Sequence, residues 1–167
     1  MRRVMSVADI CQWLHDTSIG TSIRESLWSF PILDAIHVLG LGLSIGTIVW
    51  FDLRLLGLKM TDRSVSELWR QLMPYAVAGF VVMFVSGSLL FWSEAVRAWN
   101  SIFFKIKLLA FLLAGLNALI VQLTVHRRLA LWDKQSIPPI QARIAGFLSL
   151  VLWGTIIAAG RTMAYTF

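Results

Sequence analysis

Residues 35–51 read AIHVLGLGLSIGTIVWF, with Asp34 directly before them and Asp52 directly after them. This run approaches the ~20 residues that a helix needs to cross ~30 Å of hydrocarbon. Lipid offers no hydrogen-bond partners to the backbone, so a segment at this depth must satisfy its own amide and carbonyl groups as a helix. The stretch therefore predicts a transmembrane helix, and it decides the fold class.

Three further apolar runs follow, each bounded by charged residues or by histidine. The chain is 57% hydrophobic and only 14% charged, whereas soluble domains average about 25% charged residues. Short connections between the runs favour an up-down arrangement of neighbouring helices. We therefore expect an all-α integral membrane protein, an antiparallel four-helix bundle in one unit from residue 31 to residue 167. Its predicted spans are residues 32–53, 71–93, 106–126 and 143–163.

The first 30 residues have a different pattern. Ser6 and Asp9 have the spacing of a capping box, in which each side chain bonds the other residue's backbone amide. Apolar residues then recur at helical spacing up to Leu14. The segment is too short and polar to span a bilayer, which predicts an interfacial amphipathic helix in an N-terminal segment covering residues 1–30. A second capping pattern, Ser22 with Glu25, predicts another helix start before the first span.

The net charge of +6 comes from basic residues that lie mainly between the apolar runs. This placement favours anionic lipid headgroups as partners rather than nucleic acid, for which the chain has no motif. The loops after the first and third spans group their basic residues most tightly, which places them in the cytoplasm and both termini outside.

One end of the predicted bundle collects polar residues, because antiparallel helices bring alternate span ends to the same membrane face. This end holds His15, Asp34, His37, Glu94, Arg97, Lys105, Lys107 and Arg161. His126 belongs to the opposite face, so His37 and His126 are not expected to bind one metal together. Ionisable residues at membrane depth are costly and mark a functional site by default.

His37 is the centre of the predicted site. Asp34 lies three residues before it, where a carboxylate can accept a ring N–H and orient the imidazole. Gly40 lies about one turn after it and leaves room for a flat group or for another helix. Gly42 and Gly46 form a GxxxG pattern, which predicts helix packing.

Haem is the leading cofactor prediction. His37 would be an axial ligand of the haem iron and His15 a possible second ligand, while Lys107 and Arg161 would neutralise the propionates. The open alternatives are a structural ion pair of Asp34 and His37 with Lys107 or Arg161, a quinone or proton site, and copper or another metal.

Several motifs carry a resemblance to a known family. They are Trp28-Ser29-Phe30-Pro31, Asp34, His37-Val38-Leu39-Gly40, Asp52-Leu53-Arg54-Leu55-Leu56-Gly57, Lys107-Leu108-Leu109, Asn117 and Gly160-Arg161. Together they resemble a bacterial family of small four-helix inner-membrane proteins of unknown function, from about Ser18 to the end of the chain. A looser similarity links the chain to copper-resistance D and b-type cytochrome membrane proteins. The first resemblance implies the bundle, a bacterial inner membrane and the importance of His37. That family often has glutamate where this chain has Asp34.

The leading functional prediction is a small membrane subunit that binds b-type haem and passes electrons between quinone and a partner protein. No catalytic residue is assigned, and at most the chain is an electron-transfer subunit. One alternative is a cofactor-free membrane anchor or assembly subunit, with a partner membrane or redox subunit or a second copy of the chain as its partner. Another is a small transporter or ion-handling protein that uses the polar cluster.

Overall fold

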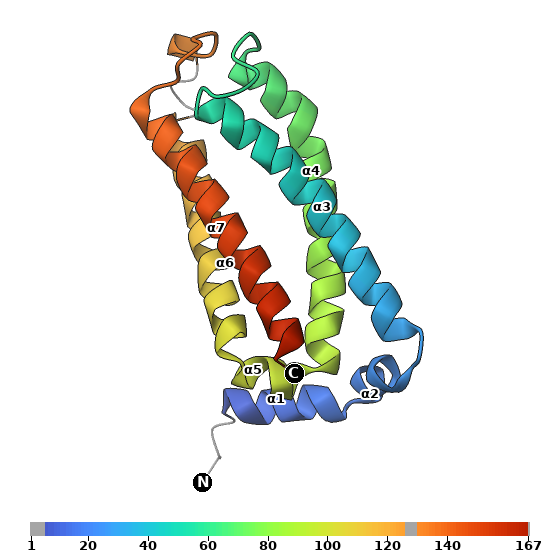
Figure 1. Ribbon diagram of the computed structural model, residues 1–167. Helices are drawn as coiled ribbons and strands as arrows, with labels where there is room; N and C mark the ends of the chain where they lie inside the picture. Colours follow the sequence, from blue (N-terminus) through green and yellow to red (C-terminus); the bar gives the residue numbers. More distant parts are fainter. Residues whose placement is uncertain (1–5, 126–129, 167) are drawn as a thin grey trace.

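Four long helices run antiparallel through the molecule in the computed structural model, which describes residues 6–125 and 130–166 (Figure 1). All four are long and apolar enough to cross a membrane. They are α3 (Ser29–Leu55), α4 (Val65–Ser93), α6 (Ile102–Ile120) and α7 (Ile140–Tyr165). The predicted all-α membrane bundle is confirmed. The helix ends extend beyond several of the predicted spans, and His126 lies outside the described residues.

The bundle is built from two hairpins. Helix α3 packs mainly on α4, helix α6 packs mainly on α7, and a smaller contact between α3 and α7 joins the pairs. Helix α6 continues into η1 (Val121–Val125), a turn of π-helix. The buried side chains along the seam between the hairpins include Ile45, Met83 and Trp153.

Small residues let the backbones of α3 and α4 approach closely. A Cβ atom on Gly79 would lie 2.5 Å from the backbone nitrogen of Ser44, and one on Gly40 would lie 2.9 Å from that of Met83. Among the described residues, nothing lies within 4 Å of a Cβ atom placed on Gly42 or Gly46. Within the chain, the predicted packing of helices on this GxxxG pair is therefore not found, because the two glycines point outward and the neighbouring small stripe makes the contact.

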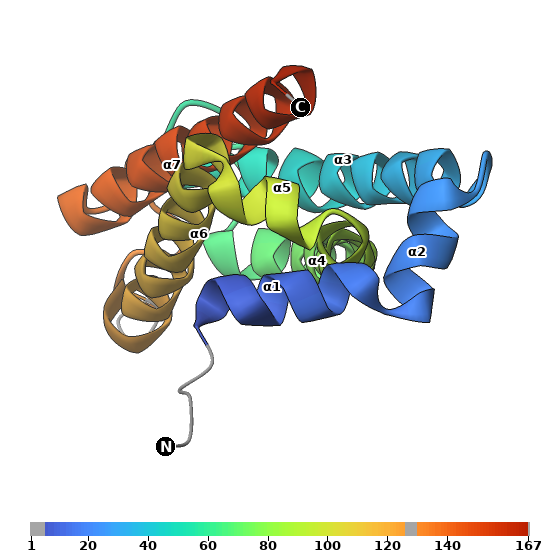
Figure 2. The same ribbon diagram turned by 90° about the horizontal axis from the view of Figure 1, so that it is seen from below.

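Three short helices cover the end of the bundle where α3 begins (Figure 2). They are α1 (Val7–Asp16), α2 (Ser18–Glu25) and α5 (Ala95–Asn100). The predicted capping box opens α1, with Ser6 N donating to Asp9 Oδ2 at 2.8 Å and Asp9 N donating to Ser6 Oγ at 3.2 Å. Helix α1 buries Cys11 and exposes Trp13, as an interfacial helix should.

The start of the second helix lies five residues earlier than predicted, with Thr17 rather than Ser22 as its N-cap. Thr17 caps α2 by accepting from the backbone nitrogen of Gly20, so Ser22 and Glu25 lie inside the helix rather than at its start. The Thr17 hydroxyl also accepts a 2.8 Å hydrogen bond from Trp92 Nε1. This bond ties the N-terminal layer to the end of α4.

Arg54 organises the opposite end of the bundle. Its side chain is completely buried. Nε donates to the carbonyl of Arg63 at 2.8 Å, and Nη2 donates to the carbonyl of Gln135 at 3.0 Å. A single guanidinium thereby joins the loop between α3 and α4 to the segment before α7.

Candidate functional site

The imidazole of His37 is held against α4. Its Nδ1 lies 3.2 Å from Ser86 Oγ, while the Ser86 hydroxyl lies 2.6 Å from the carbonyl of Val82. A serine hydroxyl has a single hydrogen to donate. With that hydrogen on Val82, Ser86 Oγ accepts from Nδ1 in the tautomer that carries the ring hydrogen there. In that tautomer of the neutral ring, the lone pair is on Nε2.

The absence of a side chain at Gly87 makes room for this ring. A Cβ atom there would lie 2.8 Å from Cε1 of His37 and 3.1 Å from Nδ1. Ser86 and Gly87 were not predicted as site residues. Their signal in the sequence is a Ser-Gly-Ser run, residues 86–88, inside an otherwise apolar span.

The predicted room beside Gly40 is occupied by a helix. Its nearest neighbours are the backbone of Met83, the carbonyl of Gly79 and the side chain of Val82. Of the two predicted uses of this space, helix packing is the one found, and no flat group fits between Gly40 and α4.

Asp34 does not orient the imidazole. It is exposed, and the described part of the chain gives it no hydrogen bond or ion pair, since the Nδ1 of His37 turns to Ser86 instead. Its charge still acts on the ring electrostatically, as does that of Lys107. Lys107 is partly buried and lies beside Gly160, with Nζ 3.6 Å from the place of a Cβ atom there. Arg161 is exposed, and neither cation forms an ion pair with a described residue.

His15 does not meet His37. Its Nδ1 lies 3.1 Å from Arg24 Nη1, and Arg24 Nη1 donates to the carbonyl of Ser93 at 2.9 Å. Ser93 follows the His37 partner Ser86 by two turns of α4, which is ~10 Å along the helix. His15 and His37 therefore have their hydrogen-bond partners at two different levels of α4. Among the described residues, no group of three or more His, Cys, Asp or Glu side chains is placed to hold a metal ion.

A cavity of about 360 Å³ lies between the four long helices, toward the Arg54 end of the bundle. Its volume falls in the range of small-molecule sites, ~300–1,000 Å³. Aromatic side chains separate it from the level of His37. Phe80 of α4 stacks on Phe111 of α6 with ring centroids 5.7 Å apart, and Phe111 meets the edge of Trp153 of α7 at 6.2 Å. The polar residues that line the cavity are Ser44, Thr47, Asp52, Asn117 and Ser149.

Asp52 is the ionisable group of this cavity. Only 4% of it is exposed, and its Oδ2 has no hydrogen-bond partner in the part of the chain that the structure describes. Ser149 of α7 lies next to the carboxyl group. Asn117 of α6 donates its Nδ2 hydrogen to the carbonyl of Ala145 at 3.0 Å, which leaves its Oδ1 as an acceptor. Buried polar groups are normally satisfied, so an unpartnered carboxylate oxygen in a cavity indicates a binding site.

No family model, curated protein or solved structure matches this chain. The resemblance to the four-helix family therefore stays a prediction, and the site is judged by its geometry.

The sequence did not predict the Asp52 cavity, because Asp52 was read as a charge that ends the first span. A signal was present, since the stripe of His37 and Ser44 continues at helical spacing through Ile48 to Asp52. An acidic residue that faces the interior of the bundle and an acidic residue that ends a span can have the same position in the sequence. They differ only in which residues of the other helices lie opposite.

Proposed function

We propose that this protein is a membrane-embedded binding protein that takes a lipid-soluble small molecule into the Asp52 cavity. The cavity itself carries the proposal, because it combines a ligand-sized volume, mainly apolar and aromatic walls, and a few polar groups that converge on one region. That combination is the usual form of a small-molecule site.

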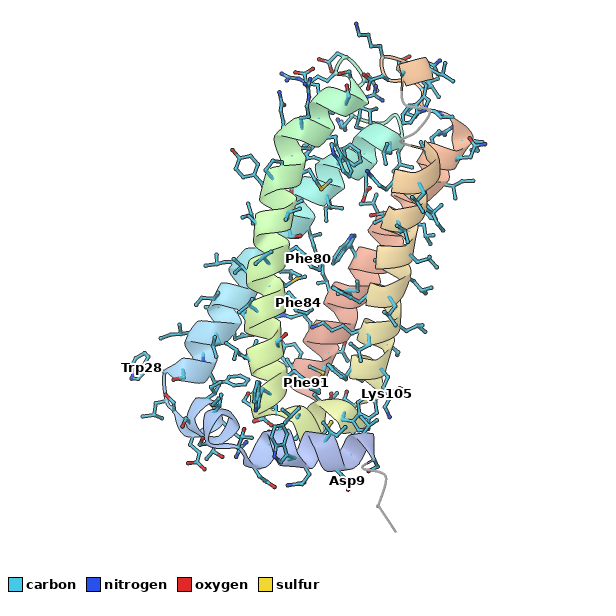
Figure 3. The ribbon with its side chains drawn as sticks, turned by 180° about the vertical axis from the view of Figure 1, so that it is seen from behind. Asp9, Trp28, Phe80, Phe84, Phe91 and Lys105 are labelled. Carbon is cyan, nitrogen blue, oxygen red and sulfur yellow. The ribbon has the colours of Figure 1, made fainter. Side chains whose placement is uncertain are left out.

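The route of entry is lateral, between α4 and α6. Val77 on α4 and Gly115 and Ala118 on α6 line the cavity and are also exposed on the outer surface. Large aromatic pairs bridge these two helices, Phe80 with Phe111 and Phe91 with Phe104, the latter with centroids 5.1 Å apart. Figure 3 looks onto this side of the bundle, with Phe80 and Phe91 labelled along α4. A molecule dissolved in the bilayer reaches such a mouth without crossing water.

Photo-crosslinking tests the proposal. The probe is a long-chain alcohol that carries a diazirine on its alkyl chain, added to the protein in zwitterionic lipid, with labelled peptides mapped by mass spectrometry. We expect saturable labelling of cavity-lining peptides. Ala114→Phe fills the cavity from α6, since Ala114 is a buried lining residue, and it should abolish saturable labelling. The matched control is Ala158→Phe on the exposed side of α7, which should leave labelling intact. Equal labelling of both variants would reject the cavity as the binding site.

The haem hypothesis rests on His37 alone in this arrangement. In the tautomer with its hydrogen on Nδ1, the free lone pair on Nε2 favours it, while the separate hydrogen-bond partners of His15 and the filled space at Gly40 disfavour it. A visible spectrum of the purified protein, oxidised and reduced, decides the question. A Soret band that disappears in His37→Ala would support haem ligation and electron transfer.

We propose a bacterial inner membrane as the location, on the family resemblance. The grouping of basic residues supports an orientation with both termini outside. Maleimide labelling of a cysteine introduced at Ser64, compared between intact cells and inverted vesicles, tests this orientation.

A further inference from the structure

Among the described residues, no cation faces the polar groups of the cavity. Oδ2 of Asp52 is unpartnered, and no Lys, Arg or His among the described residues lines the cavity. Arg54, two residues further along α3, donates to the carbonyls of Arg63 and Gln135 instead. Arg143, near the start of α7, is exposed and outside the lining. An ionised carboxylate in apolar surroundings is costly unless a cation pairs with it.

The walls of the cavity also favour a positively charged ligand. Five aromatic side chains line it, and they come from all four long helices: Phe51, Trp69, Phe80, Phe111 and Trp153. Phe51, the residue before Asp52 in the chain, meets Trp69 edge to face with ring centroids 5.4 Å apart, and both rings line the cavity. The faces of aromatic rings attract cations. Neutral ligands gain no such term, and anions are repelled by both the rings and the carboxylate.

We infer that the ligand of this cavity is an organic ammonium with an apolar tail, and that Asp52 is its counter-ion. The ammonium donates to Asp52 Oδ2, and Ser44 Oγ, which also has no hydrogen-bond partner among the described residues, and Asn117 Oδ1 are further acceptors in the lining. The aromatic rings surround the charge, and the tail extends toward the mouth between α4 and α6. This inference rests on the proposed function, because it names the class of molecule that the same cavity binds.

The test compares two diazirine probes with the same alkyl chain, one ending in a primary ammonium and the other in a hydroxyl. Both are titrated into the protein in zwitterionic lipid, and the half-saturating concentrations for labelling of cavity peptides are measured. We expect the wild-type chain to prefer the ammonium probe by about tenfold or more, the equivalent of about 1.4 kcal/mol. Asp52→Asn should reduce this preference to near unity while it still binds the alcohol.

The matched control is Asp34→Asn, which removes an exposed acid from the same helix and should keep the wild-type preference. Asp52→Glu retains the charge and should keep most of the preference, which gives a second variant if Asp52→Asn does not fold. Equal wild-type affinity for the two probes overturns the inference and leaves the proposed function standing. Saturable labelling by neither probe rejects the proposed function itself. A preference that survives in folded Asp52→Asn overturns the role of Asp52.

Discussion

The imidazole of His37 and the α-carbon of Gly87 are in direct contact across the seam between α3 and α4. A Cβ atom on Gly87 would lie 2.8 Å from Cε1 of His37, which is closer than real Cβ contacts allow. Nδ1 of the same ring lies 3.2 Å from Oγ of Ser86, the residue before the glycine. His37 is thus a packing element between two helices, whatever further role its Nε2 has.

Gly87→Ala should destabilise the bundle because the added methyl group collides with the ring. Overpacking of this kind costs ~1–3 kcal/mol. In a His37→Ala background the collision is absent, so the same substitution should cost much less. Thermal unfolding in detergent of the two single variants and the double variant gives this coupling. An identical cost of Gly87→Ala in both backgrounds would contradict the contact.

The glycines of the first two spans should differ sharply in their tolerance of alanine. Gly79→Ala places a methyl group 2.5 Å from the backbone of Ser44, which cannot move without separating α3 from α4. We expect a loss of ~1–3 kcal/mol. Gly42→Ala and Gly46→Ala meet nothing within 4 Å and should be neutral or slightly stabilising, because alanine is the better helix former. Unfolding midpoints in one detergent provide the comparison, and a destabilised Gly42→Ala would restore the GxxxG pair as a packing motif.

The sequence predicted the architecture well because hydrocarbon thickness and backbone satisfaction leave few choices for long apolar runs. The capping box of Ser6 and Asp9 was equally readable, since it depends on residues three apart. What the sequence could not give was the rotation of each helix about its axis. That rotation points Gly42 outward and Gly79 inward. It places His37 against Ser86 rather than Asp34, and it directs Asp52 into a cavity between the helices.

Helix rotation also explains why the candidate site in the structure, at Asp52, differs from the site predicted around His37. The spacing of Asp34 and His37 puts them close together on α3. The imidazole nevertheless contacts Ser86 of α4 rather than Asp34. Asp52 became a candidate only once α4, α6 and α7 supplied aromatic walls around it. The residues that make these contacts lie far apart in the sequence. The sequence shows that Asp52 shares a helical stripe with His37 and Ser44, but it does not show which residues the other helices place opposite.

Arg54→Lys should destabilise the loop end of the bundle although it keeps the charge. The guanidinium donates along separate directions to the carbonyls of Arg63 and Gln135, and a lysine ammonium cannot reproduce that fork. Losing one or two charge-assisted hydrogen bonds from a buried site predicts a cost of about 3 kcal/mol. The control is Arg70→Lys at an exposed position of α4, for which we expect a change within about 0.5 kcal/mol. Equal midpoints for the two variants would show that Arg54 does not join the loops.

Asp133 should make this loop end sensitive to acid. Its carboxylate accepts hydrogen bonds from Ser66, at 2.7 Å from the backbone nitrogen and 2.6 Å from the hydroxyl. Partial burial alone would raise the pKa of Asp133, but these bonds and the charge of Arg54 outweigh it and lower the pKa below the usual 3.8.

A lowered pKa in the folded state means that the ionised form favours folding. The stabilisation by Asp133 is therefore fully present above pH 3.8, the usual value, and is lost as the pH falls through the lower folded-state pKa. We expect the unfolding midpoint of the wild-type chain to exceed that of Asp133→Asn near neutral pH, and this difference to shrink as the sample is acidified below pH 3.8. Comparing the two chains at each pH cancels the titration of the other carboxyl groups. Ser66→Ala removes one of the donors and should give an intermediate profile, whereas a difference that stays constant with pH would exclude Asp133 as the titrating group.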